Sequence, residues 1–304
     1  MYARHSLHRR AFTALAAACG TVGVHAAVFA APRTDNAPML KDRRDGHHSL
    51  FARTCGDVLV VAHRGRLTLD QVENSLGQII ATTQSHDFMV EFDVRQSRDG
   101  DLYLLHDATL DRTTTGSGPI AERSNIELQS IRLRSPTGPT VEAIPRFEDL
   151  ARWASTVPNA KLMVDLKNAD PVKVVALLDR YGLAQRSLML TFDDKTAQAA
   201  LAFEHDVIVS VLVGTNAQID SYAAVPAKRL AFYVSQDAPT EVFTHARTQG
   251  VLVISDALMP VAGGALDERA ERDGPNAYRS FFDQRKIDIL VTNHAAAACR
   301  ALSH

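Results

Sequence analysis

The chain has 304 residues, of which 46% are hydrophobic and 22% are charged, as expected for a globular protein with a sizeable core. Its net charge of −2 at pH 7 gives no bulk attraction to nucleic acid or to an anionic membrane. No run of Lys and Arg after residue 45 suggests a local basic patch, so no nucleic-acid partner is expected.

Residues 1–30 are expected to be a secretory signal peptide. A basic start that includes Arg9 and Arg10 precedes an Ala-rich, nearly uncharged segment, and small residues at positions 28 and 30 favour cleavage after Ala30. The arginine pair resembles a twin-arginine signal, and the general secretory route stays open as the alternative. We therefore expect an exported protein, periplasmic or secreted, with no membrane span once the signal is removed.

Residues 31–54 are polar and charged and are predicted to be a linker, with residues 55–304 as the folded domain. Cys19 would leave with the signal peptide, so that Cys55 and Cys299 remain. The two ends of a closed barrel are neighbours, which allows a disulfide in an oxidising compartment. We expect instead that the two cysteines are buried free thiols.

From residue 57 onward, short apolar runs rich in β-branched residues alternate with segments of helical period. Continuous apolar runs are typical of parallel strands that are buried on both faces. The alternation predicts an α/β fold, a TIM-type (β/α)₈ barrel. Nine runs compete for eight places, and we expect Leu230–Val234 to be the extra one. The runs are Val58–Ala62, Phe88–Val94, Leu102–Leu105, Leu162–Leu166, Leu188–Phe192, Val207–Val213, Leu230–Val234, Val251–Ser255 and Ile287–Thr292.

Residues 109–146, after the third run, interrupt this alternation of strands and helices. The segment is rich in glycine and proline and has little periodicity. A long irregular segment within a compact domain is usually functional. It is therefore predicted to be a small insertion over the mouth of the barrel.

Ionisable residues close several of the apolar runs. Active sites of such barrels lie at the carboxyl ends of the strands, and the period of two puts Glu91 and Asp93 on the same inward face. Unpaired buried charges are costly unless they pair or bind metal, so the pattern points to function. The run ends are His63-Arg64-Gly65, Glu91-Phe92-Asp93, His106-Asp107, Asp165-Leu166-Lys167 and Thr292-Asn293-His294.

These residue types together suit the cleavage of a phosphate ester. Three hard oxygen ligands, Glu91, Asp93 and Asp165, would suit Mg²⁺ or Ca²⁺. Arg64 and Lys167 would supply positive charge for a phosphate. Two histidines, His63 and His106, can share general-acid and general-base roles near neutral pH.

Residues 60–118 resemble the glycerophosphodiester phosphodiesterase family. The matching segments, in order, are Ala62–Gly65, Glu73-Asn74-Ser75, Glu91–Val94, Asp99-Gly100 and His106–Gly116, with weaker similarity at Ile144–Leu150, Asp165–Lys167 and Leu290–Asn293. The resemblance implies a TIM-type barrel that hydrolyses glycerophosphodiesters to glycerol 3-phosphate and an alcohol.

The resemblance also implies roles for single residues. His63 and His106 match the acid–base pair of the family, and Arg64 and Lys167 match phosphate contacts. The residues that match the metal site are Glu91, Asp93 and Asp165, with Glu73 as a further ligand or a neighbour of the metal. From the residues alone, Glu73 could also cap the first helix together with Asn74.

The chain departs from the family pattern at three strand ends. Asp165 stands where the family usually has Glu, and Asn293 stands where it usually has Asp. Ile254-Ser255-Asp256 replaces a Trp-containing strand, so we expect the mouth to lack an aromatic wall. The partner expected from the resemblance is a small-molecule phosphodiester or the head group of a lysolipid.

Two alternatives stay open. A sphingomyelinase-D-like or lysophospholipase-D-like enzyme predicts exposed apolar residues near the barrel mouth. A non-catalytic barrel that binds glycerophosphodiesters is the other, and the intact pair His63 and His106 argues against it. We expect Asp107 to order its loop rather than to act in the chemistry.

Overall fold

A computed structural model describes residues 54–225 and 229–303. The predicted signal peptide and all of the predicted linker except Thr54 lie outside these residues. The fold described below belongs to the unit Met39–His304. In the described part of the chain, no helix is long and apolar enough to cross a membrane.

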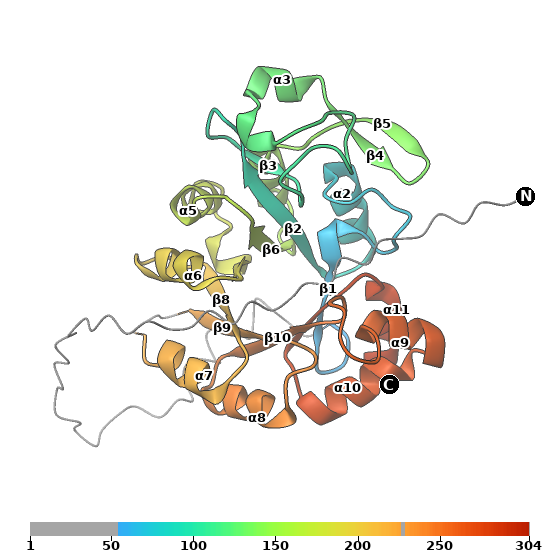
Figure 1. Ribbon diagram of the computed structural model, residues 1–304, viewed down its shortest axis with the longest axis vertical. Coiled ribbons are helices and arrows are strands. Elements are labelled where there is room, and N and C mark those ends of the chain that lie inside the picture. The colour runs from blue at the N-terminus through green and yellow to red at the C-terminus, as the bar shows by residue number, and fades with distance from the viewer. Residues whose placement is uncertain (1–53, 226–228, 304) are drawn as a thin grey trace, which may run out of the picture. The chain divides into compact units, whose positions relative to one another are not determined.

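Eight parallel strands form a closed barrel, which confirms the predicted TIM-type fold (Figure 1). Their order around the barrel is β1-β11-β10-β9-β8-β7-β6-β2, and pairing of β2 with β1 closes the ring. The strands are β1 (Leu59–Ala62), β2 (Met89–Gln96), β6 (Lys161–Leu166), β7 (Ser187–Thr191), β8 (Ile208–Val213), β9 (Leu230–Val234), β10 (Leu252–Asp256) and β11 (Ile289–Thr292).

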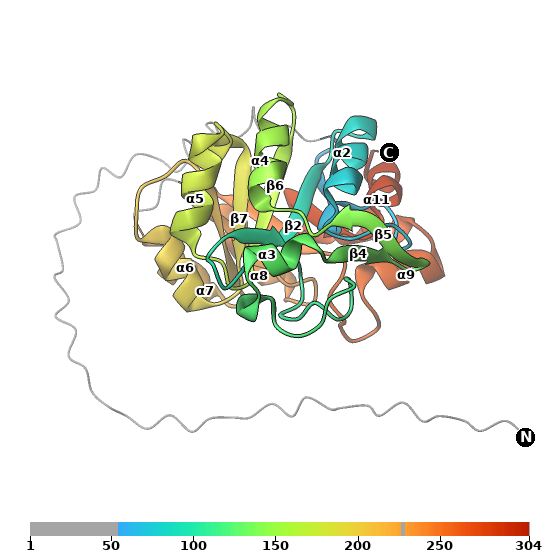
Figure 2. The ribbon, with the colours of Figure 1, turned by 90° about the horizontal axis from the view of Figure 1, so that it is seen from above.

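Helices connect the strands and lie outside the ring (Figure 2). Several begin where the sequence has a capping residue, such as Ser75, Asp170 and Asp193, whose side chains accept hydrogen bonds from backbone N–H groups of the first turn. The helices are α2 (Leu76–Ser85), α4 (Phe147–Ser155), α5 (Pro171–Arg180), α6 (Asp194–Leu201), α7 (Asn216–Ala223), α8 (Thr240–Thr248), α9 (Leu266–Asp273), α10 (Asn276–Arg285) and α11 (Ala295–Leu302).

The alternation of side chains divides the core into two layers. An inner cluster takes buried residues from each of the eight barrel strands, for example Leu59 and Val61 of β1 and Met163 of β6. The intervening residues, such as Val60 and Val164, pack against the helices. Because side chains alternate along a strand, the polar residues that follow these inner residues at the strand ends also point into the barrel.

The run that does not belong to the barrel is Leu102–Leu105, so the expectation that Leu230–Val234 is the extra strand was wrong. Strand β3 (Leu102–Leu104) pairs antiparallel with β2 and lies outside the barrel. Residues 97–101 are too few for the crossover that a parallel neighbour requires. They make a tight turn in which Gly100 has φ +91° and donates its N–H to the Ser97 carbonyl.

Residues 109–146 follow β3, which attaches this segment to the second strand of the barrel. The segment contains η2 (Ile120–Glu122), α3 (Asn125–Gln129) and a hairpin of β4 (Arg132–Ser135) and β5 (Gly138–Ala143) (Figure 1). It has a small apolar cluster of its own. Glu142 joins it to the barrel by accepting hydrogen bonds from the Ser75 hydroxyl and the Leu76 N–H at the start of α2.

A disulfide joins Cys55 to Cys299, so the expectation of two free thiols was wrong. Closure of the barrel explains the pairing. Strands β1 and β11 are neighbours, and Cys55 lies just before β1 while Cys299 lies in α11, just after β11. The bridge therefore fastens the beginning of the domain to its last helix.

Candidate active site

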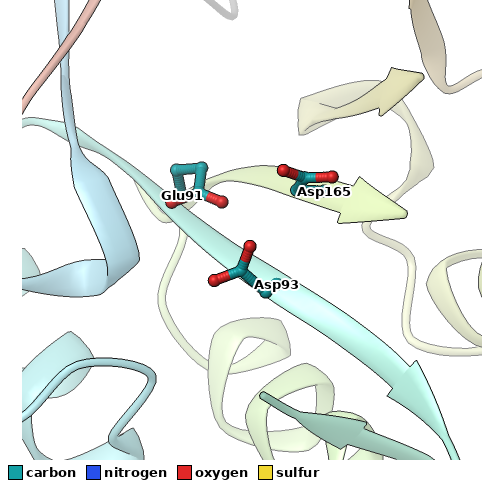
Figure 3. Close-up of side chains that lie close together, drawn as sticks. All are labelled: Glu91, Asp93 and Asp165. Atoms are coloured by element: carbon teal, nitrogen blue, oxygen red, sulfur yellow. The ribbon is translucent and has the colours of Figure 1, made fainter. Parts of the chain in front are cut away.

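Three buried carboxylates converge inside the barrel at the carboxyl ends of β2 and β6. Glu91 and Asp93 come from β2 and Asp165 comes from β6, where it is the register partner of Asp93 (Figure 3). One oxygen atom of each residue lies within 4.8 Å of the others. The inward face predicted from the period of two is therefore the face that carries these groups.

The electrostatics of this cluster are those of like charges held away from water. Burial, together with the neighbouring Asp93 and Asp165, raises the pKa of Glu91 well above its usual value. Burial also raises the pKa of Asp165 to about 6, against the opposing effect of Lys167. The pKa of Asp93 is lowered in spite of burial, because Lys167 and Arg64 favour its charged form.

The three carboxylates fit a hard divalent cation. Asp165 Oδ1 is buried without a hydrogen-bond partner, and Asp93 Oδ1 has no hydrogen bond but lies 3.2 Å from Lys167 Nζ in an ion pair. A buried polar atom without a partner is costly, and a cation would satisfy Asp165 Oδ1 and add a partner to Asp93 Oδ1. An all-oxygen donor set suits Mg²⁺ or Ca²⁺ rather than zinc.

Lys167 and Arg64 lie beside the carboxylates. Lys167 Nζ is 2.7 Å from an oxygen of Asp165 and 3.2 Å from one of Asp93. Arg64 Nε is 3.6 Å from Asp93, and the Arg64 backbone N–H donates to Glu91 at 2.7 Å. Positive charge is thus concentrated at the edge of the carboxylate cluster, as the sequence predicted.

A strained turn directs the Arg64 N–H at Glu91. Arg64 has φ +54° and ψ +30°, a left-handed conformation that is uncommon outside glycine. The next residue, Gly65, also has a positive φ, and a Cβ atom there would lie 2.2 Å from the Ile79 side chain. The His63-Arg64-Gly65 sequence therefore permits a turn that packs directly on α2.

His63 is partly buried and is held by a neutral partner. Its Nδ1 lies 2.8 Å from the amide oxygen of Asn293, and its Nε2 lies 3.9 Å from Glu91. Burial and the nearby Arg64 lower the pKa of His63 to about 4. An amide oxygen only accepts hydrogen bonds, so Nδ1 carries the hydrogen and Nε2 is left unprotonated.

His106 is held by a carboxylate instead. Its Nδ1 is 2.7 Å from Asp107, which also receives two hydrogen bonds from Arg112. Burial lowers the pKa of His106 more than Asp93 and Asp107 raise it. Asp107 therefore orients a predicted catalytic side chain, whereas the sequence led us to expect only an ordering role in its loop.

Glu73 does not join the three-carboxylate group. Its two oxygens pair with Arg64 and Arg112 at 2.8–3.0 Å, and Arg66 lies at 3.6 Å. These arginines lower the pKa of Glu73 in spite of its burial. Its predicted role as a metal ligand has no geometric support, and it contacts the site through Arg64.

Several functional residues were missed or underrated in the sequence. Asn74 donates to Asp93 at 2.8 Å and accepts from the Asp93 N–H, so it fixes that carboxylate. Arg112 links Asp107 to Glu73, and the buried Arg66 lies beside Arg64 at the mouth. The motif segments Glu73-Asn74-Ser75 and His106–Gly116 contain Asn74 and Arg112, but their contacts depend on loop conformations that periodicity does not encode.

One cavity of about 800 Å³ brings the predicted residues together. Its charged lining includes His63, Arg64, Glu91, His106, Asp165 and Lys167. Phe192 and Tyr233 line the same cavity and pack edge to face, with ring centroids 5.0 Å apart. The expectation that the mouth lacks an aromatic wall was thus wrong, because these rings come from β7 and β9 instead of β10.

The family model described as "Glycerophosphoryl diester phosphodiesterase family" matches residues 63–260. The chain belongs to this family. Members of the glycerophosphoryl diester phosphodiesterase family hydrolyse phosphoric diesters, and the matched range includes all eight of the predicted site residues.

Individual relatives agree with the family assignment. A probable glycerophosphodiester phosphodiesterase 2 of Mycobacterium tuberculosis is 25% identical over 245 residues, which is 79% of this chain and 89% of that protein. A glycerophosphoryl diester phosphodiesterase of Parabacteroides distasonis has the same fold, with a TM-score of 0.69 at 23% identity, covering 87% of this chain and 92% of its own.

A phosphodiesterase of Oleispira antarctica, solved in complex with the product sn-glycerol-3-phosphate, also shares the fold. Its TM-score is 0.64 at 18% identity, over 80% of this chain and 96% of its own.

Proposed function

We propose that this chain hydrolyses glycerophosphodiesters to glycerol 3-phosphate and an alcohol, with the help of Mg²⁺ or Ca²⁺. The observation that carries the proposal is a cluster of three buried carboxylates, two of which, Glu91 and Asp165, line one cavity together with two histidines and two cationic side chains. Family membership supports the same reaction. The product-bound Oleispira antarctica relative supports glycerol 3-phosphate as the product.

Glu91, Asp93 and Asp165 would hold the cation, which would neutralise charge on the phosphate. Arg64 and Lys167 would bind the phosphate oxygens from the side. The ion pairs that these two residues make with Asp93 and Asp165 keep both side chains at the edge of the cluster. Arg66, which lines the same cavity, would add a third positive charge.

His63 and His106 would move the protons of the reaction. One Nε2 accepts the proton of the attacking hydroxyl, which belongs either to water or to the glycerol 2-hydroxyl of the substrate. The other histidine gives a proton to the leaving alcohol as its bond to phosphorus breaks. Acceptor groups at both Nδ1 atoms support this proposal, because each leaves Nε2 free for the proton transfer.

We also propose that the protein is exported to the periplasm or secreted. The disulfide between Cys55 and Cys299 supports an oxidising compartment. The expected signal peptide in residues 1–30 supports the same localisation, although it lies outside the described residues. Mass spectrometry of the protein recovered from the periplasm and medium tests this, and a mature N-terminus that follows Ala30 is the expected result.

The proposed reaction is tested with glycerophosphocholine, glycerophosphoethanolamine and glycerophosphoglycerol as substrates, followed by phosphorus NMR. Glycerol 3-phosphate is the expected end product in the presence of Mg²⁺ or Ca²⁺, and a transient cyclic phosphate would identify the glycerol hydroxyl as the attacking group. If these substrates bind but are not hydrolysed with Mg²⁺, with Ca²⁺ or without added metal, the result would favour a non-catalytic barrel.

A further inference from the structure

The proposed catalytic side chains and the large apolar side chains lie on different strands around the mouth of the barrel. The neighbouring strands β11, β1, β2 and β6, together with His106 after β3, supply the histidine and carboxylate side. The next strands around the ring, β7, β8 and β9, present Phe192, Leu212 and Tyr233 at the corresponding inward positions. Between β9 and β11, strand β10 places Asp256 at the inward position, and Ser235 and Asp237 line the cavity after β9. The residues proposed for phosphate chemistry therefore lie opposite the large apolar side chains.

The apolar side includes large side chains that remain partly exposed to solvent. Phe192 and Leu212 are each 40% exposed, and Met259, in the loop after β10, is 58% exposed. These are three of the seven exposed large hydrophobic residues in the described ranges, 54–225 and 229–303, and all three line the catalytic cavity. Such clustering beside a site marks a binding surface more often than chance exposure does.

Hydrogen bonds with the buried side chains of Asp256 and Gln236 fix the backbone of the loop that carries Met259. The buried Asp256 accepts hydrogen bonds from the N–H groups of Leu258 and Met259, at 2.8 and 2.7 Å. Gln236 donates to the Met259 carbonyl and accepts from the Leu266 N–H. Met259 is therefore presented on a fixed backbone, which favours a surface built for binding.

We infer that this apolar wall, formed by Phe192, Leu212, Tyr233, Leu258 and Met259, binds an aliphatic chain carried by one alcohol of the phosphodiester. The inference rests on the proposed function and names the substrate class of that same site. The wall is continuous with the phosphate side, because Lys167 Nζ lies 5.9 Å from the centre of the Phe192 ring. A cavity of 800 Å³ falls in the upper part of the size range of ligand pockets, about 300–1,000 Å³, which leaves room for a chain.

The composition of the wall favours an aliphatic chain over a quaternary ammonium group. A cationic head group is recognised by several aromatic faces. Only two aromatic rings lie on this wall, and they already pack against each other edge to face. Leu212, Leu258 and Met259 add apolar surface beside the rings, and these side chains gain from contact with methylene groups. Ser235 and Asp237 also line this side of the cavity, where the Ser235 hydroxyl donates to Asp237.

Two substrate series test the inference, each kept below its critical micelle concentration so that binding to an interface plays no part. The first is lysophosphatidylcholine with increasing acyl length, in which the chain is on the glycerol. The second is glycerophosphate esterified with linear alcohols of increasing length, in which the chain is on the other alcohol. Glycerophosphocholine and glycerophosphomethanol are the members without a chain.

We expect kcat/KM to rise about two- to fourfold for each added methylene in one of the two series, until the wall is covered. The slope of log(kcat/KM) against chain length should flatten in Leu212→Ser and in Met259→Ser. Both side chains are exposed, so neither substitution opens a core cavity. The slope should be unchanged in Ile126→Ser, a matched control on α3 that is 80% exposed and does not line the cavity.

Turnover of the chain-free diesters with no rise in either series would overturn the inference and leave the proposed function standing. A rise that persists in Leu212→Ser and Met259→Ser would equally overturn the role of the wall. Hydrolysis of none of the diesters would overturn the proposed function, and the inference with it.

Discussion

Asp93 on β2 and Asp165 on β6 are register partners, and both carboxylates lie within ion-pair distance of Lys167 Nζ, at 3.2 and 2.7 Å. Lys167 and Arg64, which also pairs with Glu73, supply fewer positive charges than Asp93, Asp165 and Glu91 would carry together when ionised. This shortage of positive charge favours protonation of the cluster in the absence of a cation, and the proposed divalent cation would make it up. The predictions below depend on this competition and on the partners of the two histidines.

In addition to Glu91, whose pKa is raised well above its usual value, Asp165 should make the affinity for the cation depend on pH. Burial raises the pKa of this carboxyl to about 6, so below that pH a cation must displace a proton, whereas above it the carboxylate is free to bind. Calorimetric titration with Mg²⁺ or Ca²⁺ should show affinity falling up to about tenfold per pH unit below pH 6. In Asp165→Asn the affinity should be weaker and its dependence on pH shallower. Equal affinity on both sides of pH 6 would contradict the assignment.

Asp107 should act by positioning His106. Asp107→Asn keeps the size of the side chain but removes the charge that receives hydrogen bonds from both His106 and Arg112. We expect kcat to fall by about 10²-fold with little change in KM, because the substitution disturbs the orientation and tautomer of a proton-transfer group.

Asp111→Asn is the matched control for Asp107→Asn. This aspartate lies in the same loop and accepts hydrogen bonds from the Gly118 N–H, at 3.0 Å, and from the Thr109 side chain, both within the loop. Its kcat should stay within about twofold of the wild type. Equal losses in the two variants would mean that Asp107 matters only for the order of the loop.

Replacement of Asn293 by Asp should raise the pKa of His63. Burial and Arg64 now lower that pKa to about 4, and the neutral amide at Nδ1 offsets little of this effect. A carboxylate at the same position would stabilise the imidazolium ion, so the NMR titration of His63 should move upward toward its ordinary value. If unprotonated His63 is required, the acidic limb of kcat/KM moves to higher pH as well.

An exposed substitution of the same type, Asn216→Asp at the start of α7, controls for the added charge. It should leave the titration of His63 unchanged. A pKa of His63 that stays near 4 in Asn293→Asp would show that the hydrogen bond between the two side chains does not form in solution.

The disulfide should contribute substantially to stability. It closes a loop with a sequence separation of 244 residues, so it restricts the unfolded chain strongly. Urea unfolding of the double variant Cys55→Ala and Cys299→Ala should show a loss of about 2–5 kcal/mol. Reductant should destabilise the wild type by a similar amount and have no effect on the double variant. Equal free energies of unfolding of the wild type and the double variant would show that the disulfide does not stabilise the fold.

Reasoning from strand periodicity predicted the barrel and the central carboxylates because side-chain direction in a strand follows from the period of two. The inner cluster contains Met89 of β2, so Glu91 and Asp93 had to point inward as well. The same argument places Asp165 inward after Met163. These positions depend only on local geometry and on the closure of the sheet.

Features that depend on loops or on long-range contacts could not be predicted in the same way. Glu73 faces arginines instead of the carboxylate cluster, in a loop where Arg64 and Asn74 both have φ +54°. Strand β3 runs antiparallel because of a tight turn at Gly100. The pairing of Cys55 with Cys299 required the ring of strands to be closed first.

The cation dependence of glycerophosphocholine hydrolysis tests the central claim most directly. The wild type and Asp165→Asn are treated with EDTA, and the rate of glycerol 3-phosphate formation is then measured against free Mg²⁺ or Ca²⁺. We predict no turnover in EDTA, saturable recovery in the wild type, and at least a tenfold weaker activation constant in Asp165→Asn, or about 1.4 kcal/mol. Wild-type turnover that continues undiminished in EDTA would contradict the account.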